Sequence, residues 1–436
     1  MKRLSLWNLF ALLVLTGTSQ AQLNKTFENI FNRVLRDDLQ LSIGLHGTHF
    51  FEAADEANAA LAPALNSLIA SNVSSFPLSS TVAGVTFDFS SGQPMSIAES
   101  LGPIFAEKAQ TLGKGKLNIG FNYTSLNLAR LRGMKTDDIR FTFAHQDLTD
   151  DGTLGENPTE NDVIDLFLNL DASANIFAFY GTWGVTNSFD VSVAVPVVNV
   201  TMNGTARAVV NSFTLANLGR AFHSFNADQL NPDLVDDVPY DESVTGLGDV
   251  ALRLKYSILA GGELDLAALA DIRFATGEET DFLGTGKTNA RFSWIMSRKV
   301  GNFVPHLNLG YDRRGADLDS DEFEFVLGFD NKIAKGVTFA ADLLAEIDIN
   351  NDEAIKLAPG SVTIVDNNAT TGARSQRFVD LSNISDRDND NTIDVALGFR
   401  IAPSENFLFL ANVLVPLNDG GLRSTFAPTI GLAISF

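Results

Sequence analysis

Residues 248–258 read GDVALRLKYSI, and residues 263–274 read ELDLAALADIRF. In both stretches apolar side chains such as Val250 and Leu252 occupy even positions, and charged ones such as Arg253 occupy odd positions. Because successive strand side chains point to opposite faces, the two stretches predict a hairpin with one apolar and one charged face. The pattern persists for about eleven residues per arm, more than the usual soluble strand of about five or six and enough to cross a bilayer at a tilt. This hairpin predicts a transmembrane β-barrel.

Composition narrows the class of protein further. The chain has 436 residues and a net charge of -22, which argues against nucleic acid as a partner because phosphates require a basic surface. Cysteine is absent, so disulfides and thiolate sites are excluded. Beyond the amino terminus no apolar run is long enough for a helical span, so any membrane crossing must be made by strands.

Residues 1–21 have the layout of a signal peptide. Lys2 and Arg3 precede an apolar run from Leu9 to Leu15. The small residues Ser19 and Ala21 occupy the two positions that a signal peptidase reads before the expected cleavage after Ala21. The run is too short for a membrane anchor. We therefore expect export from the cytoplasm of a Gram-negative cell and location in its outer membrane.

Residues 22–83 do not alternate. Phe27, Ile30 and Phe31 follow helical spacing, and an Ala-rich stretch from Ala53 to Ala70 follows. Such a leader lies either in the periplasm or inside the barrel, and its apolar stripe favours a partly helical plug in the lumen, since exposed Phe and Ile need cover.

From residue 84 onward the pattern predicts an all-β, antiparallel barrel of about fourteen strands, with 12–16 possible. The expected strands are 84–90, 117–130, 137–147, 163–182, 187–211, 247–259, 263–275, 287–298, 302–313, 321–333, 336–349, 391–402, 405–416 and 423–436. Long connections, including 91–116, 212–246 and 350–390, alternate with short ones such as 131–136, as external loops and periplasmic turns do. The domain plan is therefore a signal peptide over 1–21, a plug over 22–83 and a barrel over 84–436.

Two strands carry additional signals. In 187–211 the apolar residues move from odd to even positions at Pro196, which predicts a bulge in the wall or, less expected, a side opening. The last strand is amphipathic and ends at Phe436, a pattern that the outer-membrane assembly machinery is thought to read. Membrane lipid and lipopolysaccharide are the other expected partners.

Catalytic, cofactor and metal sites are not predicted. Residues 284–288 read GTGKT but lack the earlier glycine and the helix of a phosphate loop, and 386–390 read DRDND without the glycine and final acid of a calcium loop. Weak binding of this acidic loop to lipopolysaccharide through divalent ions is an alternative that the sequence leaves open. His46 and His49 either line a passage in the plug or are ordinary turn residues.

Charged side chains on the inward faces are the candidate lumen lining. The residues are Arg140, Arg253, Lys255, Asp271, Arg273, Arg291, Glu324, Asp342 and Arg400. Selective ion pores tend to carry rings of one sign, whereas mixed signs suit ion pairs across strands and contacts to a plug.

Three short segments carry a family resemblance. The opening TGLGD at 245–249, the segment IRFTFAH at 139–145 and the stretch 109–116 resemble the outer-membrane proteins assigned to the phenol meta-degradation pathway, which are relatives of the FadL-type channels. The resemblance implies passive uptake of hydrophobic small molecules through a plugged barrel. One departure is that the Asn-Pro-Ala of FadL-type plugs is here Ala62-Pro63-Ala64, so ligand residues are not carried over.

The function expected from the sequence is a channel for hydrophobic or aromatic small molecules, without enzymatic activity. A structural or surface-binding barrel and a general porin are the alternatives, and a barrel hydrolase is a more distant one.

Overall fold

The computed structural model describes residues 22–41, 49–74, 76, 87–88, 95–96, 101, 104–315, 320–349, 355–367, 374–404 and 406–436. The expected signal peptide and His46 lie outside these residues. Within the described part of the chain, no helix is both long and apolar enough to cross a membrane.

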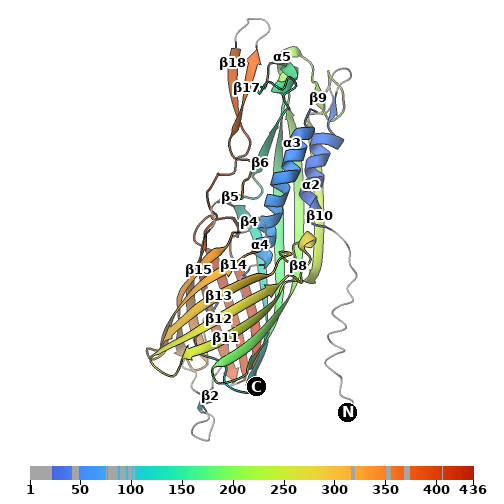
Figure 1. Ribbon diagram of the computed structural model, residues 1–436. Helices are drawn as coiled ribbons and strands as arrows, with labels where there is room; N and C mark the ends of the chain where they lie inside the picture. Colours follow the sequence, from blue (N-terminus) through green and yellow to red (C-terminus); the bar gives the residue numbers. More distant parts are fainter. Residues whose placement is uncertain are drawn as a thin grey trace, which may run out of the picture.

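Twelve antiparallel strands close into a barrel, shown in the lower half of Figure 1. Each strand pairs with its two neighbours, and pairing of β7 with β8 completes the ring. The strands in chain order are β4 (Leu117–Leu131), β7 (Val163–Gly184), β8 (Phe189–Asn211), β11 (Val250–Leu259), β12 (Leu264–Phe274), β13 (Asn289–Arg298), β14 (Phe303–Arg313), β15 (Glu322–Ala334), β16 (Val337–Asp348), β19 (Thr392–Ser404), β20 (Phe407–Pro416) and β22 (Ala427–Ser435).

Two barrel strands continue far beyond the wall. The lower halves of β7 and β8 pair with β4 and β11, whereas their upper halves pair with β6 (Ile139–Ala144) and β10 (Val235–Leu247). The strands β6, β7, β8 and β10 thus form a four-stranded sheet, here called the extension, which rises above the barrel in Figure 1.

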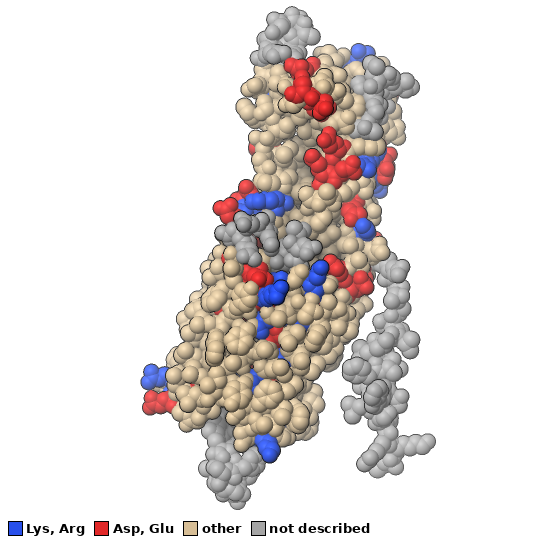
Figure 2. Space-filling view, viewed as in Figure 1, with Lys and Arg blue, Asp and Glu red and all other residues tan. Residues whose placement is uncertain are grey.

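The outer surface changes character along β7. The even positions are buried over the whole strand. The outward positions include exposed Phe177, Phe179 and Trp183 in the barrel and, from Asn175 upward, polar residues with the exception of Phe167. Asn175 pairs with Asn199 of β8, where outward valines also give way to polar side chains. Figure 2 shows a similar contrast on the visible face, where much of the barrel wall is free of charge and acidic groups gather above the barrel. The apolar belt, which is typical of a lipid-facing surface, therefore ends near Asn175.

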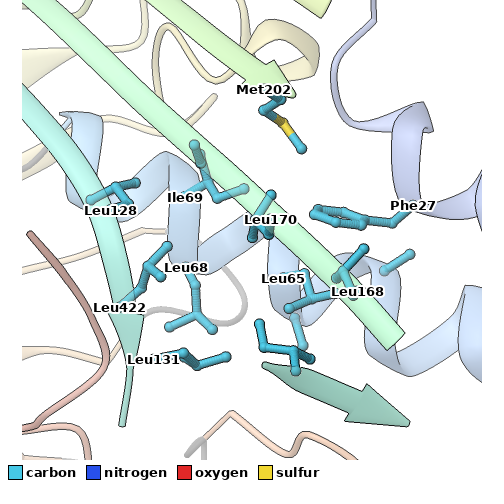
Figure 3. Close-up of a cluster of buried hydrophobic side chains, with 14 of the residues drawn as sticks. Phe27, Leu65, Leu68, Ile69, Leu128, Leu131, Leu168, Leu170, Met202 and Leu422 are labelled. Atoms are coloured by element: carbon cyan, nitrogen blue, oxygen red, sulfur yellow. The ribbon is translucent and has the colours of Figure 1, made fainter. Parts of the chain in front are cut away.

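Helices cover the inner face of the extension. They are α2 (Lys25–Asn32), α3 (Phe51–Glu56) and α4 (Ala62–Ser74). A π-helical turn at Arg33–Asp37 continues α2, and a second one at Ala57–Leu61 joins α3 to α4. Phe27 and Ile69 are buried against Leu168, Leu170 and Met202 of β7 and β8, as Figure 3 shows. The inward side chains of the extension are apolar and need this cover, so the leader packs there. The expected plug in the lumen is thus incorrect for these helices, apart from the end of α4, which reaches the barrel mouth.

The barrel has twelve strands rather than about fourteen, and two expected strands account for the difference. In place of 84–90 the structure describes only β2 (Phe87–Asp88), which pairs with β3 (Met95–Ser96) outside the barrel sheet. In place of 137–147 it has β6, which pairs only with the upper half of β7. The connection 131–136, expected as a periplasmic turn, consequently lies at the long-loop end.

Pro196 lies in an unbroken ladder. The register between β7 and β8 runs without a shift from Val163↔Asn211 to Gly184↔Asp190, so the bulge expected in β8 is not found there. On its other edge β8 changes partner at Pro196, whose carbonyl accepts a hydrogen bond from the N–H of Gly248 at 2.9 Å. Because the N–H and C=O of a strand residue point to the same side, the missing N–H faces this junction and takes no bond from β7.

The long-loop end carries the remaining elements. A hairpin of β17 (Ser361–Asn367) and β18 (Arg374–Asp380) lies between β16 and β19. The others are α5 (Phe213–Leu218), β1 (Gln40–Leu41) paired with β9 (His223–Ser224), the two short strands β5 (Met134–Lys135) and β21 (Leu422–Ser424) beside β4, and 3-10 turns at Pro158–Asn161 and Glu279–Asp281.

Candidate functional site: the barrel lumen

Residues 104–112, here called the lumen segment, cross the inside of the barrel. One carboxylate oxygen of Asp342 accepts hydrogen bonds from three successive backbone N–H groups, those of Ile104 (3.0 Å), Phe105 (2.9 Å) and Ala106 (3.1 Å). Successive N–H groups that converge in this way form an anion-binding concavity. The carboxylate of β16 therefore fixes one end of the segment.

Ion pairs hold the middle of the lumen segment. Glu107 lies 3.4 Å from a guanidinium nitrogen of Arg253 and 3.2 Å from Nζ of Lys255, and Lys108 lies 3.3 Å from Asp330. All these side chains are largely shielded from solvent, so the pairs are screened less than surface pairs. The opposite charges of Glu107 and Lys108 thus bind two different wall strands, β11 and β15.

Further polar contacts hold the rest of the segment. The N–H of Ala109 donates to the hydroxyl of Ser297 at 3.2 Å, and the N–H of Leu112 donates to Asp190 at 2.8 Å. These partners belong to β13 and β8 and lie near the short-turn end of the barrel. The segment therefore closes that end, and the expected external loop 91–116 is incorrect over residues 104–112.

A cavity of about 160 Å³ opens at the opposite end of the lumen. Part of its lining is apolar, from α4 and from wall residues such as Leu126, Leu344 and Leu414. Another part is acidic, with Glu346 and Asp394 among its carboxylates. We call this amphipathic space the mouth cavity.

A second cavity of about 60 Å³ lies deeper in the lumen. It shares Leu344 and Glu346 with the mouth cavity, and Phe105 and Glu107 of the lumen segment belong to its lining. The two cavities are therefore neighbours, and the lumen segment lines the deeper one.

Most of the expected lumen residues lie inside the barrel as parts of one polar network. Arg253 donates to Asp271 at 2.8 Å, and Arg291 lies 2.7 Å from Glu324. Arg400 donates to the carbonyl of Ile104 at 3.4 Å. Lys255 and Asp342 bind the lumen segment as described above, and Arg273 donates to the carbonyl of Ser74 at the end of α4. The mixed charges thus serve ion pairs and the fixing of inserted chain.

Arg140 is the exception. It lies on β6 opposite Phe167, whose side chain is exposed on the outer face of the extension, so Arg140 does not line the lumen. The other leader residues named from sequence are Phe27 and Phe31, which are buried in the cover of the extension, and His49, which lies beside two other histidines.

Sequence reasoning missed the lumen segment altogether. Glu107 contacts residues 146 and 148 positions away, and Asp342 contacts residues 236 to 238 positions away. The segment shows no period, so only its isolated pair Glu107-Lys108 distinguished it from a surface loop.

A family model matches residues 152–421, which is more than half of the chain, and is described as "Putative MetA-pathway of phenol degradation". The chain belongs to this family. In this member of the phenol-degradation family, the matched part runs from the connection that precedes β7 through β20. The leader helices and the lumen segment precede the match.

Similarity to solved structures is low in identity. The outer membrane channel COG4313 from Pseudomonas putida F1 is 10% identical, with a TM-score of 0.41, over 75% of this chain and 98% of that one. The porin NanC is 9% identical, with a TM-score of 0.34, over 73% and 98%. A FadL homologue of Pseudomonas aeruginosa is 9% identical, with a TM-score of 0.32, over 78% and 92%. No curated protein sequence matches this chain.

Proposed function

We propose that this protein is an outer-membrane channel through which small hydrophobic or aromatic molecules enter passively. Membership in a family described by phenol degradation supports an aromatic substrate. A closed barrel with an apolar belt supports location in the outer membrane, where backbone groups of a spanning chain must be paired internally.

The mouth cavity is the observation that carries the proposal. Its volume of about 160 Å³ is close to the ~150 Å³ of an apolar cavity that accommodates benzene. Leu68 of α4 together with Leu344 and Leu414 of the wall offers apolar contact to a ring. The carboxylates of Glu346 and Asp394 can accept a hydrogen bond from a hydroxyl substituent. A single aromatic ring that carries a hydroxyl group fits both parts.

The closed lumen favours a selective channel over a general porin. Porins leave an aqueous channel, whereas here the lumen segment is bonded to the wall across the lumen, and its Phe105 and Glu107 line the deeper cavity. Passage therefore requires the lumen segment to move or the substrate to leave the lumen before reaching it. A general porin would need neither step.

Blocking the mouth cavity tests the proposal. Ser71 of α4 lines this cavity, so Ser71→Trp should fill it, whereas Ala59→Trp on the exposed side of the preceding helical turn should not. Initial uptake of labelled phenol would be measured in porin-deficient Gram-negative cells that express each variant. We expect the wild type and Ala59→Trp to raise uptake equally, and Ser71→Trp to return it to that of cells without the protein.

Two results would contradict the channel. Equal uptake by cells with Ser71→Trp and by cells with Ala59→Trp would mean that phenol does not pass through the mouth cavity. Proteoliposomes that swell in sugars at rates of open porins would instead indicate a general porin. A surface-binding barrel would be indicated if uptake stayed at the background level for all variants and a bound ligand were lost on trimming residues 212–246 and 350–390.

A further inference from the structure

Three histidines from distant parts of the chain converge inside the extension. His49 directly precedes α3, His145 follows β6, and His223 belongs to β9. Each is at most 2% exposed, and their candidate ligand nitrogens all lie within 4.8 Å of one another. Nδ1 of His49 lies 3.0 Å from Nε2 of His223 and also contacts Nε2 of His145.

Hydrogen bonds on the far side of two rings determine which nitrogen carries the proton. Nδ1–H of His145 donates to the carbonyl of Gln146 at 2.6 Å, and Nδ1–H of His223 donates to the carboxylate of Asp162 at 2.7 Å. Asp162 is fully buried and also accepts hydrogen bonds from the N–H and hydroxyl of Thr214. When both rings are neutral, their Nε2 atoms therefore present lone pairs toward Nδ1 of His49.

Two lone pairs thus converge on one nitrogen that carries at most one proton. A single N–H cannot point along the hydrogen-bond direction of two acceptors at the same time. A metal cation among the three rings would instead accept a lone pair from each of them. The arrangement of donors and acceptors therefore fits a metal ion better than a proton.

We propose that His49, His145 and His223 bind one divalent transition metal ion of the class that prefers imidazole, with Zn²⁺ as the ion to test. With Zn–N bonds of about 2.0–2.1 Å, a tetrahedral site separates its ligand nitrogens by about 3.3–3.4 Å. Nδ1 of His49 lies 3.0 Å from Nε2 of His223 and closer still to Nε2 of His145, so the rings must move apart to admit the ion. Asp162 acts on His223 as the carboxylates behind zinc-bound histidines do, by fixing the tautomer and the ring orientation.

The backbone holds the three ligands in place independently of the metal. The N–H of Gln146 donates to the carbonyl of His49 at 2.9 Å, and His223 pairs with Leu41 in the small sheet of β1 and β9. The Phe50 ring packs edge-on against His145 and His223, with centroids 5.3 and 5.4 Å away. Three protein ligands leave a fourth position for water. The ion would fasten the leader to β6 and to the connection between β8 and β10.

Zinc binding by the purified full-length protein tests this site. The protein in detergent would be treated with a chelator, freed of it, and titrated with zinc chloride by calorimetry. We expect one Zn²⁺ per chain, and X-ray absorption should show three imidazole nitrogens around it. His145→Gln and His223→Gln should each abolish this stoichiometric binding.

Matched variants separate the site from the acidic surface. Asp162→Asn should weaken binding by about 10- to 100-fold because it alters the support of His223. Asp165→Asn removes a nearby carboxylate that bonds Thr142 and Asn211 instead, and should bind zinc as the wild type does. Heat-dependent mobility on gels would verify that each variant is folded. An absence of one-to-one binding in the wild type, or equal binding by a variant with all three histidines replaced by Gln, would overturn the proposal.

Discussion

At the scale of single residues, Asp342 connects the barrel wall to the lumen segment. Its side chain is 1% exposed and accepts three N–H groups of the lumen segment through one oxygen and Nε2 of His306, 2.8 Å away, through the other. Hydrogen bonds to an ionised acceptor are shorter and about twice as strong as neutral ones. One carboxylate therefore holds both the wall and the segment that closes it.

We expect Asp342→Ala to open the channel. Three backbone N–H groups would lose their acceptor, and each costs about 1–3 kcal/mol if it stays buried without a partner, so the segment should leave its place. Single-channel recordings in planar bilayers should show a nearly silent wild type and a conducting variant. Asp312→Asn is the control, because Asp312 is a buried lumen carboxylate that bonds Arg291 and Arg314. Equal conductance of Asp342→Ala and the wild type would mean that Asp342 does not hold the closure.

At the scale of elements, β8 shows how one strand serves two environments. Its even positions face inward throughout, but the partner on one edge changes from β11 to β10 at Pro196. Below this point the outward side chains meet lipid and are apolar. Above it the inward side chains meet helices and are apolar instead. The shift in the apolar pattern at Pro196 therefore reports a change of surroundings and not a change of backbone register.

We expect substitutions at two neighbouring residues of β8 to differ in how much they change the stability of the barrel. Pro196→Ala should change the free energy of unfolding by less than about 1 kcal/mol, since the restored N–H faces the junction and not β7. Val195→Pro should destabilise the barrel, because Val195 bonds toward β7 and a ladder hydrogen bond would be lost, at about 1–3 kcal/mol for the unpaired carbonyl. The urea midpoint of the heat-modifiable gel band measures both. Similar midpoints for the two variants would contradict the assigned direction of the Pro196 peptide group.

At the scale of the whole molecule, the apolar belt determines how much of the chain lies in the membrane. The belt ends between Phe177 and Asn175 on β7, and the extension with its helices continues beyond it. Short turns lie at the opposite end, which is the periplasmic end in outer-membrane barrels. We therefore expect the extension, the leader and the mouth cavity to lie on the external side.

Lipid contact can be measured with single tryptophans. The native residues Trp7, Trp183 and Trp294 would be replaced by Phe, and one Trp placed at Phe177 or at Phe167, both of which are exposed on the outer face of β7. The two sites lie ten residues apart along the strand, or about 33 Å. We expect brominated lipids to quench the fluorescence of Phe177→Trp and not that of Phe167→Trp. Equal quenching at both sites would place the extension in the membrane.

The sequence by itself located the residues of the twelve barrel strands, because alternation is a local signal that each strand carries within its own residues. The same signal also predicted two further wall strands, 84–90 and 137–147, which the barrel does not contain. Helical spacing likewise predicted the helices of the leader, and inward charges predicted a polar lumen. These features follow from periods of two and of about 3.6 residues, which need no knowledge of partners.

Only the tertiary structure decided where these elements pair. β6 alternates in a manner that suits a barrel strand, yet its position depends on the extra length of β7 and β8. The lumen segment has no period at all, and its place depends on carboxylates and cations from six wall strands, β8, β11, β12, β15, β16 and β19. His49 lies 96 and 174 positions from its histidine neighbours, so no spacing in the sequence could bring them together. Local periodicity reports which faces of an element differ, whereas contacts between distant residues depend on how the whole chain closes on itself.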